Sequence, residues 1–117
     1  STFNWPRRVL EAFEMMERSY DTILNKVRSD QRYDYQTVFR SDTSHGSFET
    51  ANKESGNTMK KYGKQRQFLV NGEMREMQAH IKLGGTKNTS KCLRIHFIFD
   101  TKSEKFLIGH CGNHLPI

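Results

Sequence analysis

The sequence contains few hydrophobic residues, few cysteines and no long apolar segment. Only 34% of its 117 residues are hydrophobic, against the ~45–50% of an ordinary soluble protein, so we expect a small core. No apolar run approaches the ~20 residues that span a bilayer, and the N-terminus lacks the pattern of a signal peptide. We therefore expect a soluble, cytoplasmic protein. Cys92 and Cys111 are the only cysteines, and in a chain long enough to form its own core they are expected to be free thiols.

Acidic residues are scarce in the second half of the chain. Residues 59–117 contain 11 Lys and Arg but only 4 Asp and Glu, a net charge of +7. Residues 1–58 contain 8 Lys and Arg and 9 Asp and Glu, a net charge of −1. The overall charge of +6 therefore belongs to the second half. This asymmetry favours a phosphate-rich partner such as nucleic acid, although a solvated basic surface would have the same composition.

The first segment with a clear pattern is helical. Pro6 suits the first turn of a helix and Asn4 suits its cap. Apolar residues then recur every three or four positions, at Val9, Leu10, Phe13, Met16, Tyr20, Ile23, Leu24 and Val27. The pattern predicts one amphipathic helix over about residues 6–28, packed on a sheet and carrying no chemistry of its own.

Residues 29–65 are rich in turn-forming side chains and poor in periodicity. We predict short strands at residues 35–40 and 47–51 and a long loop at 52–64. Loops longer than about 12–15 residues are usually functional or disordered.

Basic side chains in this loop and in a later polar loop are candidates for nucleic-acid binding. The first loop combines lysines with Tyr62, which suits a nucleic-acid contact but is equally typical of a solvated loop. The candidates are Lys60, Lys61, Lys64, Lys87 and Lys91.

The second half has the pattern of an antiparallel sheet. Residues 68–70 precede Asn71-Gly72, a strong hairpin signal, and residues 73–83 then alternate. The alternation places Met77, Ala79, Ile81 and Leu83 on one face and Glu76, Gln78, His80 and Lys82 on the other, although Met74, Met77 and Ile81 also fit a helical spacing.

Two further strands complete the predicted sheet. Apolar residues at 93, 95, 97 and 99 alternate with Cys92, Arg94, His96 and Ile98. A turn at 100–104 leads to a returning strand over 105–111, in which Gly109 marks a kink or a β-bulge. The predicted fold is a single α+β domain over residues 1–117: a helix at about 6–28, a loop-rich segment at about 29–65 and an antiparallel meander at about 66–115.

Four of the five histidines lie between residues 80 and 114, among basic residues of the predicted strands. An imidazole accepts or donates a proton near neutral pH, and Lys and Arg stabilise charge on a phosphate. These groups together are those needed to cleave RNA without a metal, by attack of a 2′-hydroxyl on the adjacent phosphorus. The candidate catalytic residues are His80, Lys82, Arg94, His96, His110 and His114.

Other chemistries remain open for the same residues. Cys92, His110, Cys111 and His114 offer four zinc-type donors, but their spacing matches no standard zinc motif. A thiolate pair of His110 and Cys111 is disfavoured because adjacent strand residues point to opposite faces. We therefore predict no metal and no cofactor.

The end of the sequence resembles a known family. The motifs His80-Ile81-Lys82-Leu83-Gly84, Leu93-Arg94-Ile95-His96-Phe97 and Leu107-Ile108-Gly109-His110, with the final His114, resemble the last strands of RelE/ParE-type toxins. The resemblance covers about residues 74–117. It implies a barnase-like ribonuclease fold in which Lys82 and Arg94 contact phosphate and His110 or His114 is the terminal acid or base. His80 and His96 have no counterpart in the family's pattern and rest on strand alternation alone.

The sequence thus leads to two functional hypotheses. The first is a metal-independent endoribonuclease that acts as a toxin or antiphage effector. The second is a nucleic-acid-binding module without turnover that uses the same basic face. In both cases we expect RNA as the partner, with a protein antitoxin or a larger parent protein, and no membrane.

Overall fold

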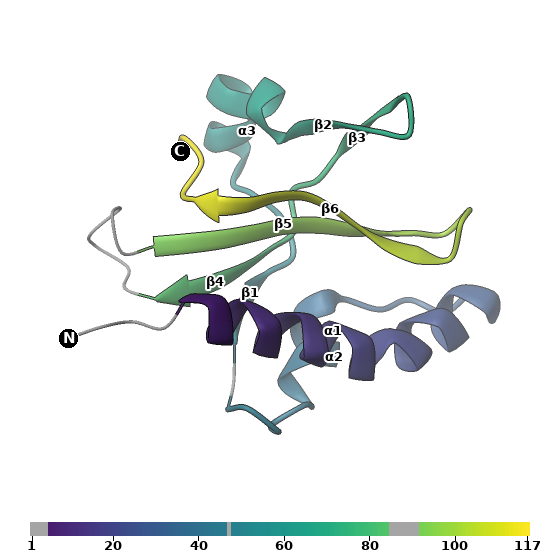
Figure 1. Cartoon of the computed structure of the whole chain (residues 1–117). Helices are drawn as coiled ribbons and strands as arrows, with labels where there is room; N and C mark the ends of the chain where they lie inside the picture. The colour runs from purple at the N-terminus through teal and green to yellow at the C-terminus, as the bar shows by residue number, and fades with distance from the viewer. Residues whose placement is uncertain (1–4, 47, 85–91) are drawn as a thin grey trace.

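The computed structural model describes residues 5–46, 48–84 and 92–117 (Figure 1). Two helices open the chain, α1 (Trp5–Arg28) and α2 (Tyr35–Arg40), followed by the short strand β1 (Glu49–Ala51). Helix α3 (Gly56–Tyr62) and the 3-10 turn η1 (Gly63–Arg66) lead into the hairpin β2 (Gln67–Val70) and β3 (Glu73–Glu76). The last three strands are β4 (His80–Gly84), β5 (Cys92–Asp100) and β6 (Lys105–Asn113).

The strands form two antiparallel sheets. The larger has the order β1-β4-β5-β6, and the smaller is the β2–β3 hairpin. Figure 1 shows α1 and α2 on one face of the larger sheet and α3 with the hairpin on the other. The protein is therefore α+β, as the sequence predicts. Its long helix α1 packs with α2 on one face of the larger sheet.

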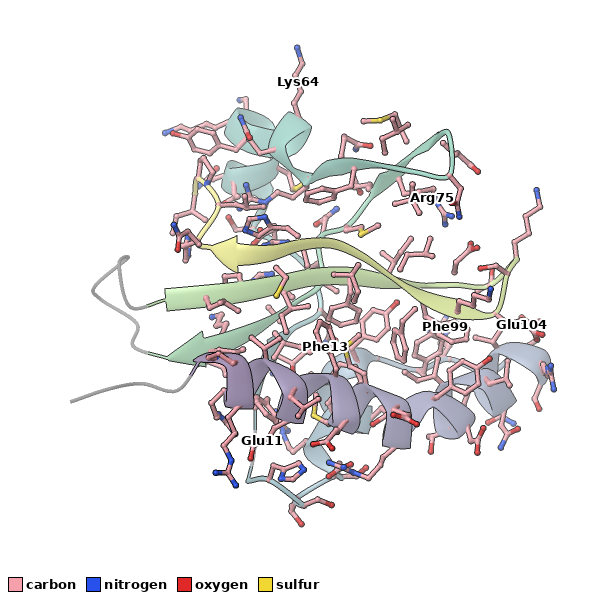
Figure 2. The ribbon with its side chains drawn as sticks, viewed as in Figure 1. Glu11, Phe13, Lys64, Arg75, Phe99 and Glu104 are labelled. Carbon is pink, nitrogen blue, oxygen red and sulfur yellow. The ribbon has the colours of Figure 1, made fainter. Side chains whose placement is uncertain are left out.

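The core lies between α1, α2 and the larger sheet. Ile81, Ile95 and Phe97 of the sheet are completely buried, and Figure 2 shows Phe13 of α1 and Phe99 of β5 in this layer. Helix α1 ends where Asp30 adopts a positive φ of 54°. The amide of Gln31 there donates to the carbonyl of Lys26, which closes the helix and redirects the chain toward α2.

Two predictions for the segment before the hairpin are wrong. Residues 35–40 form α2 rather than a strand, because the side chain of Asp34 accepts a hydrogen bond from the Thr37 amide and caps a helix. Residues 56–62 form α3 within the predicted loop, and Ser55 caps it through the Thr58 amide.

The predicted strand over residues 73–83 is divided in two. The amide of Met77 donates to the carbonyl of Arg66, and the amide of Phe97 donates to the carbonyl of Ala79, so the chain leaves the hairpin and joins the larger sheet. Ala79, Ile81 and Leu83 are buried in the main core as predicted, but Met77 is buried outside that cluster. The segment does not form the helix that the spacing of Met74, Met77 and Ile81 would also allow.

The hairpin and the last two strands are confirmed, but the predicted meander over about residues 66–115 is wrong, because β2 and β3 form a sheet of their own. Asn71 and Gly72 form the hairpin turn with φ values of 52° and 80°. In the β5–β6 ladder His96 pairs with His110 and Phe97 with Ile108, which leaves Gly109 as the bulged residue. A Cβ at Gly109 would lie 2.5 Å from the ring of Phe68, so the bulge lets the hairpin pack directly on β6. Among the described residues, no helix is long and apolar enough to cross a membrane.

Candidate active site

Paired residues of β4 and β5 form the floor of a pocket on the sheet face opposite α1 and α2. His80 is in register with His96, and Lys82 is in register with Arg94. The segment around α3, the turn η1 and the chain after β6 complete the walls, and the cavity has a volume of about 200 Å³. The pocket is thus lined by four separate parts of the chain: residues 54–66, β4, β5 and residues 114–117.

Five of the six predicted catalytic residues line this pocket: His80, Lys82, Arg94, His96 and His114. The sixth, His110, lies beside it, with its ring edge-on to that of His96 at 5.9 Å between centroids. The structure therefore brings together the four residues that strand alternation places on one face, His80, Lys82, Arg94 and His96, with the two histidines near the end of the chain.

Two buried arginines in the pocket have donors without partners. Arg66 is 1% exposed; its Nε donates to Glu54 Oε2 at 2.7 Å, while its Nη1 has no hydrogen-bond partner among the described residues. Arg94 is 5% exposed; its Nη1 donates to the Leu93 carbonyl, while its Nε also lacks a partner. Buried donors are almost always satisfied, so two unpaired cationic donors beside one pocket are unusual, and the positive charge of both arginines favours an anion there.

The two floor histidines are stacked and hold one tautomer. Their rings lie 4.8 Å apart at 27°. Nδ1 of His80 is 2.9 Å from the Gln78 carbonyl oxygen, and Nδ1 of His96 is 3.3 Å from that of Met77. Because a carbonyl oxygen only accepts, Nδ1 carries the proton on both rings and Nε2 keeps its lone pair.

Burial lowers the pKa of both floor histidines because desolvation disfavours the charged imidazolium. The pKa of His96 falls to about 3 because burial and, to a smaller extent, the neighbouring His80 both lower it. Both imidazoles are therefore neutral at physiological pH and available as bases or ligands.

The histidines near the end of β6 are less deeply placed. His110 Nε2 lies 2.7 Å from the Asn113 carbonyl oxygen, and His114 Nδ1 lies 2.6 Å from that of Leu115. Both side chains are only partly buried, in contrast to His80 and His96. His114 thus reaches the pocket from a side that solvent can reach.

Lys82 lines the pocket and is paired with a carboxylate of the neighbouring strand. Its Nζ lies 3.2 Å from Oε1 of Glu49, the residue in register with it on β1. The Glu49 side chain is 63% exposed, so this pair is weak and a phosphate could compete for the lysine.

Sequence analysis missed Glu54 and Arg66. Glu54 lies in the loop predicted at 52–64, and Arg66 lies between that loop and the strand predicted at 68–70, so no periodicity assigns either side chain to a face. Glu54 also approaches His80, with 3.8 Å between Oε1 and Nδ1. In the sequence, the one signal for Glu54 was that it is a carboxylate among basic residues. This signal does not place Glu54 in the pocket unless the path of the chain is known.

The lysines predicted to bind nucleic acid fall into two groups. Lys60 and Lys61 on α3 and Lys64 on η1 are exposed, and Figure 2 shows Lys64 pointing away from the body of the protein. Lys87 and Lys91 lie outside the described residues. The exposed lysines share the side of the sheet that carries the pocket (Figure 1).

The zinc alternative based on β6 is not supported. Cys111 is in register with Ile95 and His110 with His96, so the two lie on opposite faces of the sheet. The side chain of Cys92 is outside the described residues. Within the described part of the chain, the one cluster of three residues with ligand atoms close enough for a metal is Glu54, His80 and His96.

Comparison of the chain with models of known families, with curated proteins and with solved structures finds no match. The site must therefore be interpreted from its own geometry.

Proposed function

We propose that the protein is a metal-independent endoribonuclease. The observation that supports this most strongly is the presence, in one pocket, of two arginines with unpaired donors and two neutral imidazoles. The arginines suit a phosphate, and an imidazole lone pair suits the 2′-hydroxyl beside it.

In the proposed reaction His80 is the general base. Its Nε2 accepts the proton of the 2′-hydroxyl, and the 2′-oxygen attacks the adjacent phosphorus. Glu54, 3.8 Å from the opposite ring nitrogen, stabilises the imidazolium that forms. His96 packs against His80 and fixes the plane of its ring.

The arginines and His114 carry the rest of the reaction. Arg66 and Arg94, which line the pocket, stabilise the non-bridging oxygens with their positive charge as negative charge accumulates there. His114, on the more open side, protonates the departing 5′-oxygen. The products are a 2′,3′-cyclic phosphate and a 5′-hydroxyl.

The architecture is compatible with the family resemblance noted from the sequence. Helices lie on one face of an antiparallel sheet, and a basic, histidine-containing pocket lies on the other. On this basis we propose a cytoplasmic toxin or antiphage effector that acts on RNA, controlled by a protein antitoxin or by a larger parent protein.

A nucleic-acid-binding module without turnover is the second candidate. The observation that favours it is the burial of the floor histidines, which are only 7% and 1% exposed. In that case they are structural, and the exposed lysines hold the nucleic acid. Its affinity then falls steeply with salt because each contacted phosphate releases counterions.

The two candidates are separated by incubating end-labelled single-stranded RNA with the protein in EDTA. The ribonuclease cleaves, and His80→Ala lowers the rate by ~10²–10⁴-fold while RNA affinity changes little. His45→Ala is the matched control, because His45 contacts Glu11 and Glu14 of α1. Salt-sensitive binding with no products would support the binding module instead.

A further inference from the structure

Glu54, His80 and His96 form a cluster that the proposed reaction does not fully explain. Each offers one ligand atom, and the three atoms lie within 4.8 Å of one another. They come from the segment before α3, from β4 and from β5. Two imidazoles and a carboxylate are a donor set that binds Zn²⁺ with one coordination position left open.

The hydrogen bonds around the two histidines suit metal binding. Histidines that bind metals almost always donate their second ring N–H to a carbonyl or a carboxylate, which fixes the ring and its tautomer. His80 and His96 have this arrangement through the carbonyls of Gln78 and Met77. Their remaining nitrogens need no rearrangement of protons to accept a metal.

Glu54 is also held in place by a second partner. Its Oε2 accepts from Arg66 at 2.7 Å, whereas Oε1 lies 3.8 Å from Nδ1 of His80 and accepts no hydrogen bond from the described residues. Arg66 thus orients the carboxylate while one oxygen stays available as a ligand.

The distances require only a small contraction. A point equidistant from three atoms 4.8 Å apart lies about 2.8 Å from each. Zinc bonds to nitrogen and oxygen are about 2.0–2.2 Å, so each donor has to move by roughly 0.7 Å. The stacked rings of His80 and His96 also have to turn, so that both nitrogen lone pairs point at the ion.

Charge in the pocket limits which metal is bound. Arg66 and Arg94 oppose a cation, so hard ions that depend on several carboxylates are disfavoured. A metal with strong imidazole affinity tolerates them, and the arginines then favour an anionic fourth ligand such as hydroxide or phosphate.

We propose that Glu54, His80 and His96 bind Zn²⁺ and that the bound ion inhibits the enzyme. The binding is independent of the ribonuclease activity; the inhibition rests on the proposed function, because zinc occupies the lone pair with which His80 accepts the 2′-hydroxyl proton. Zinc would then act as a reversible regulator of this site.

Binding is tested on the full chain without RNA. Titration with Co²⁺ should produce visible d–d absorption at one equivalent, and Zn²⁺ should displace the Co²⁺. His96→Gln and Glu54→Gln should lower the affinity at least tenfold, whereas His45→Ala and Cys111→Ser should leave it unchanged. Because Glu54→Gln also breaks the pair with Arg66, circular dichroism checks its folding and His96→Gln provides the independent variant.

A spectrum that survives His96→Gln, or that is lost in Cys111→Ser, would overturn the site. RNA cleavage is measured in parallel: Zn²⁺ should suppress it and EDTA should restore it. Cleavage that requires zinc would overturn inhibition and the metal-independent reaction together. If RNA is not cleaved under any condition, the proposed function fails, while the Co²⁺ titration still decides whether the metal site exists.

Discussion

The ion pair between Glu54 and Arg66 allows a quantitative test of how the pocket is built. The side chain of Arg66 is 1% exposed, that of Glu54 is 9% exposed, and Nε and Oε2 are 2.7 Å apart. Removing one partner of a buried pair leaves an uncompensated charge and typically costs about 3–5 kcal/mol, a large part of a domain's ~5–15 kcal/mol. We expect Glu54→Gln to cost about this much, because Arg66 then remains buried beside Arg94.

Arg66→Met should cost less, because Glu54 retains His80 as a neighbour. The double variant should be more stable than the sum of the single effects predicts, with a coupling energy of roughly 2–3 kcal/mol for groups in direct contact. The three variants and the native chain are compared by urea unfolding followed by circular dichroism.

Inorganic phosphate adds a second readout to the same variants. With the carboxylate neutralised, an anion in the pocket should recover part of the stability of Glu54→Gln, by about 2.7 kcal/mol at 100 times its dissociation constant. Additive single effects, with coupling below ~0.5 kcal/mol, would show that the pair is not buried as described.

Three further predictions concern the hairpin, the buried histidines and the proposed acid. Gly109→Ala should cost at least about 1–3 kcal/mol, since the new methyl group meets the Phe68 ring at 2.5 Å, whereas Gly56→Ala, in open space, should cost nothing; thermal unfolding compares them. Burial lowers the pKa of His96 to about 3, so below an unfolded pKa of about 6.5 the unfolded chain binds a proton that the folded chain does not. Stability is therefore lost as the pH falls through this range, by about 2 kcal/mol at about pH 5 in EDTA, and His96→Gln should reduce the loss in urea titrations. His114→Ala should slow RNA cleavage by ~10²–10⁴-fold, and a leaving group of low pKa should rescue it; an unchanged rate would exclude His114 as the acid.

The strands of the second half were predictable because one face of each is buried. Alternation over β5 separates Ile95 and Phe97 from Arg94 and His96, and a shift of one residue would reverse every side chain. The same rule places His80 and Lys82 on the face of the pocket. Strand pairing then brings the basic groups together without further information.

The first half was less predictable because its elements are short. Helix α2 has six residues, and its pattern of Tyr35, Val38 and Phe39 is too brief to distinguish helix from strand. Its formation depends on the Asp34 cap and on packing of Tyr35 against Phe97. Glu54 and Arg66 were missed for the same reason: their burial results from the tertiary path of the chain and leaves no periodic signal.

The chemical identity of the product ends tests the proposed reaction most directly. A short single-stranded RNA is cleaved in EDTA and the fragments are analysed by mass spectrometry. Attack by the 2′-hydroxyl predicts 2′,3′-cyclic phosphate and 5′-hydroxyl ends, and no cleavage of an RNA with 2′-deoxy sugars at the cleavage positions. Fragments with 3′-hydroxyl and 5′-phosphate ends, or cleavage of the deoxy substrate, would contradict the roles assigned to His80, Arg66 and Arg94.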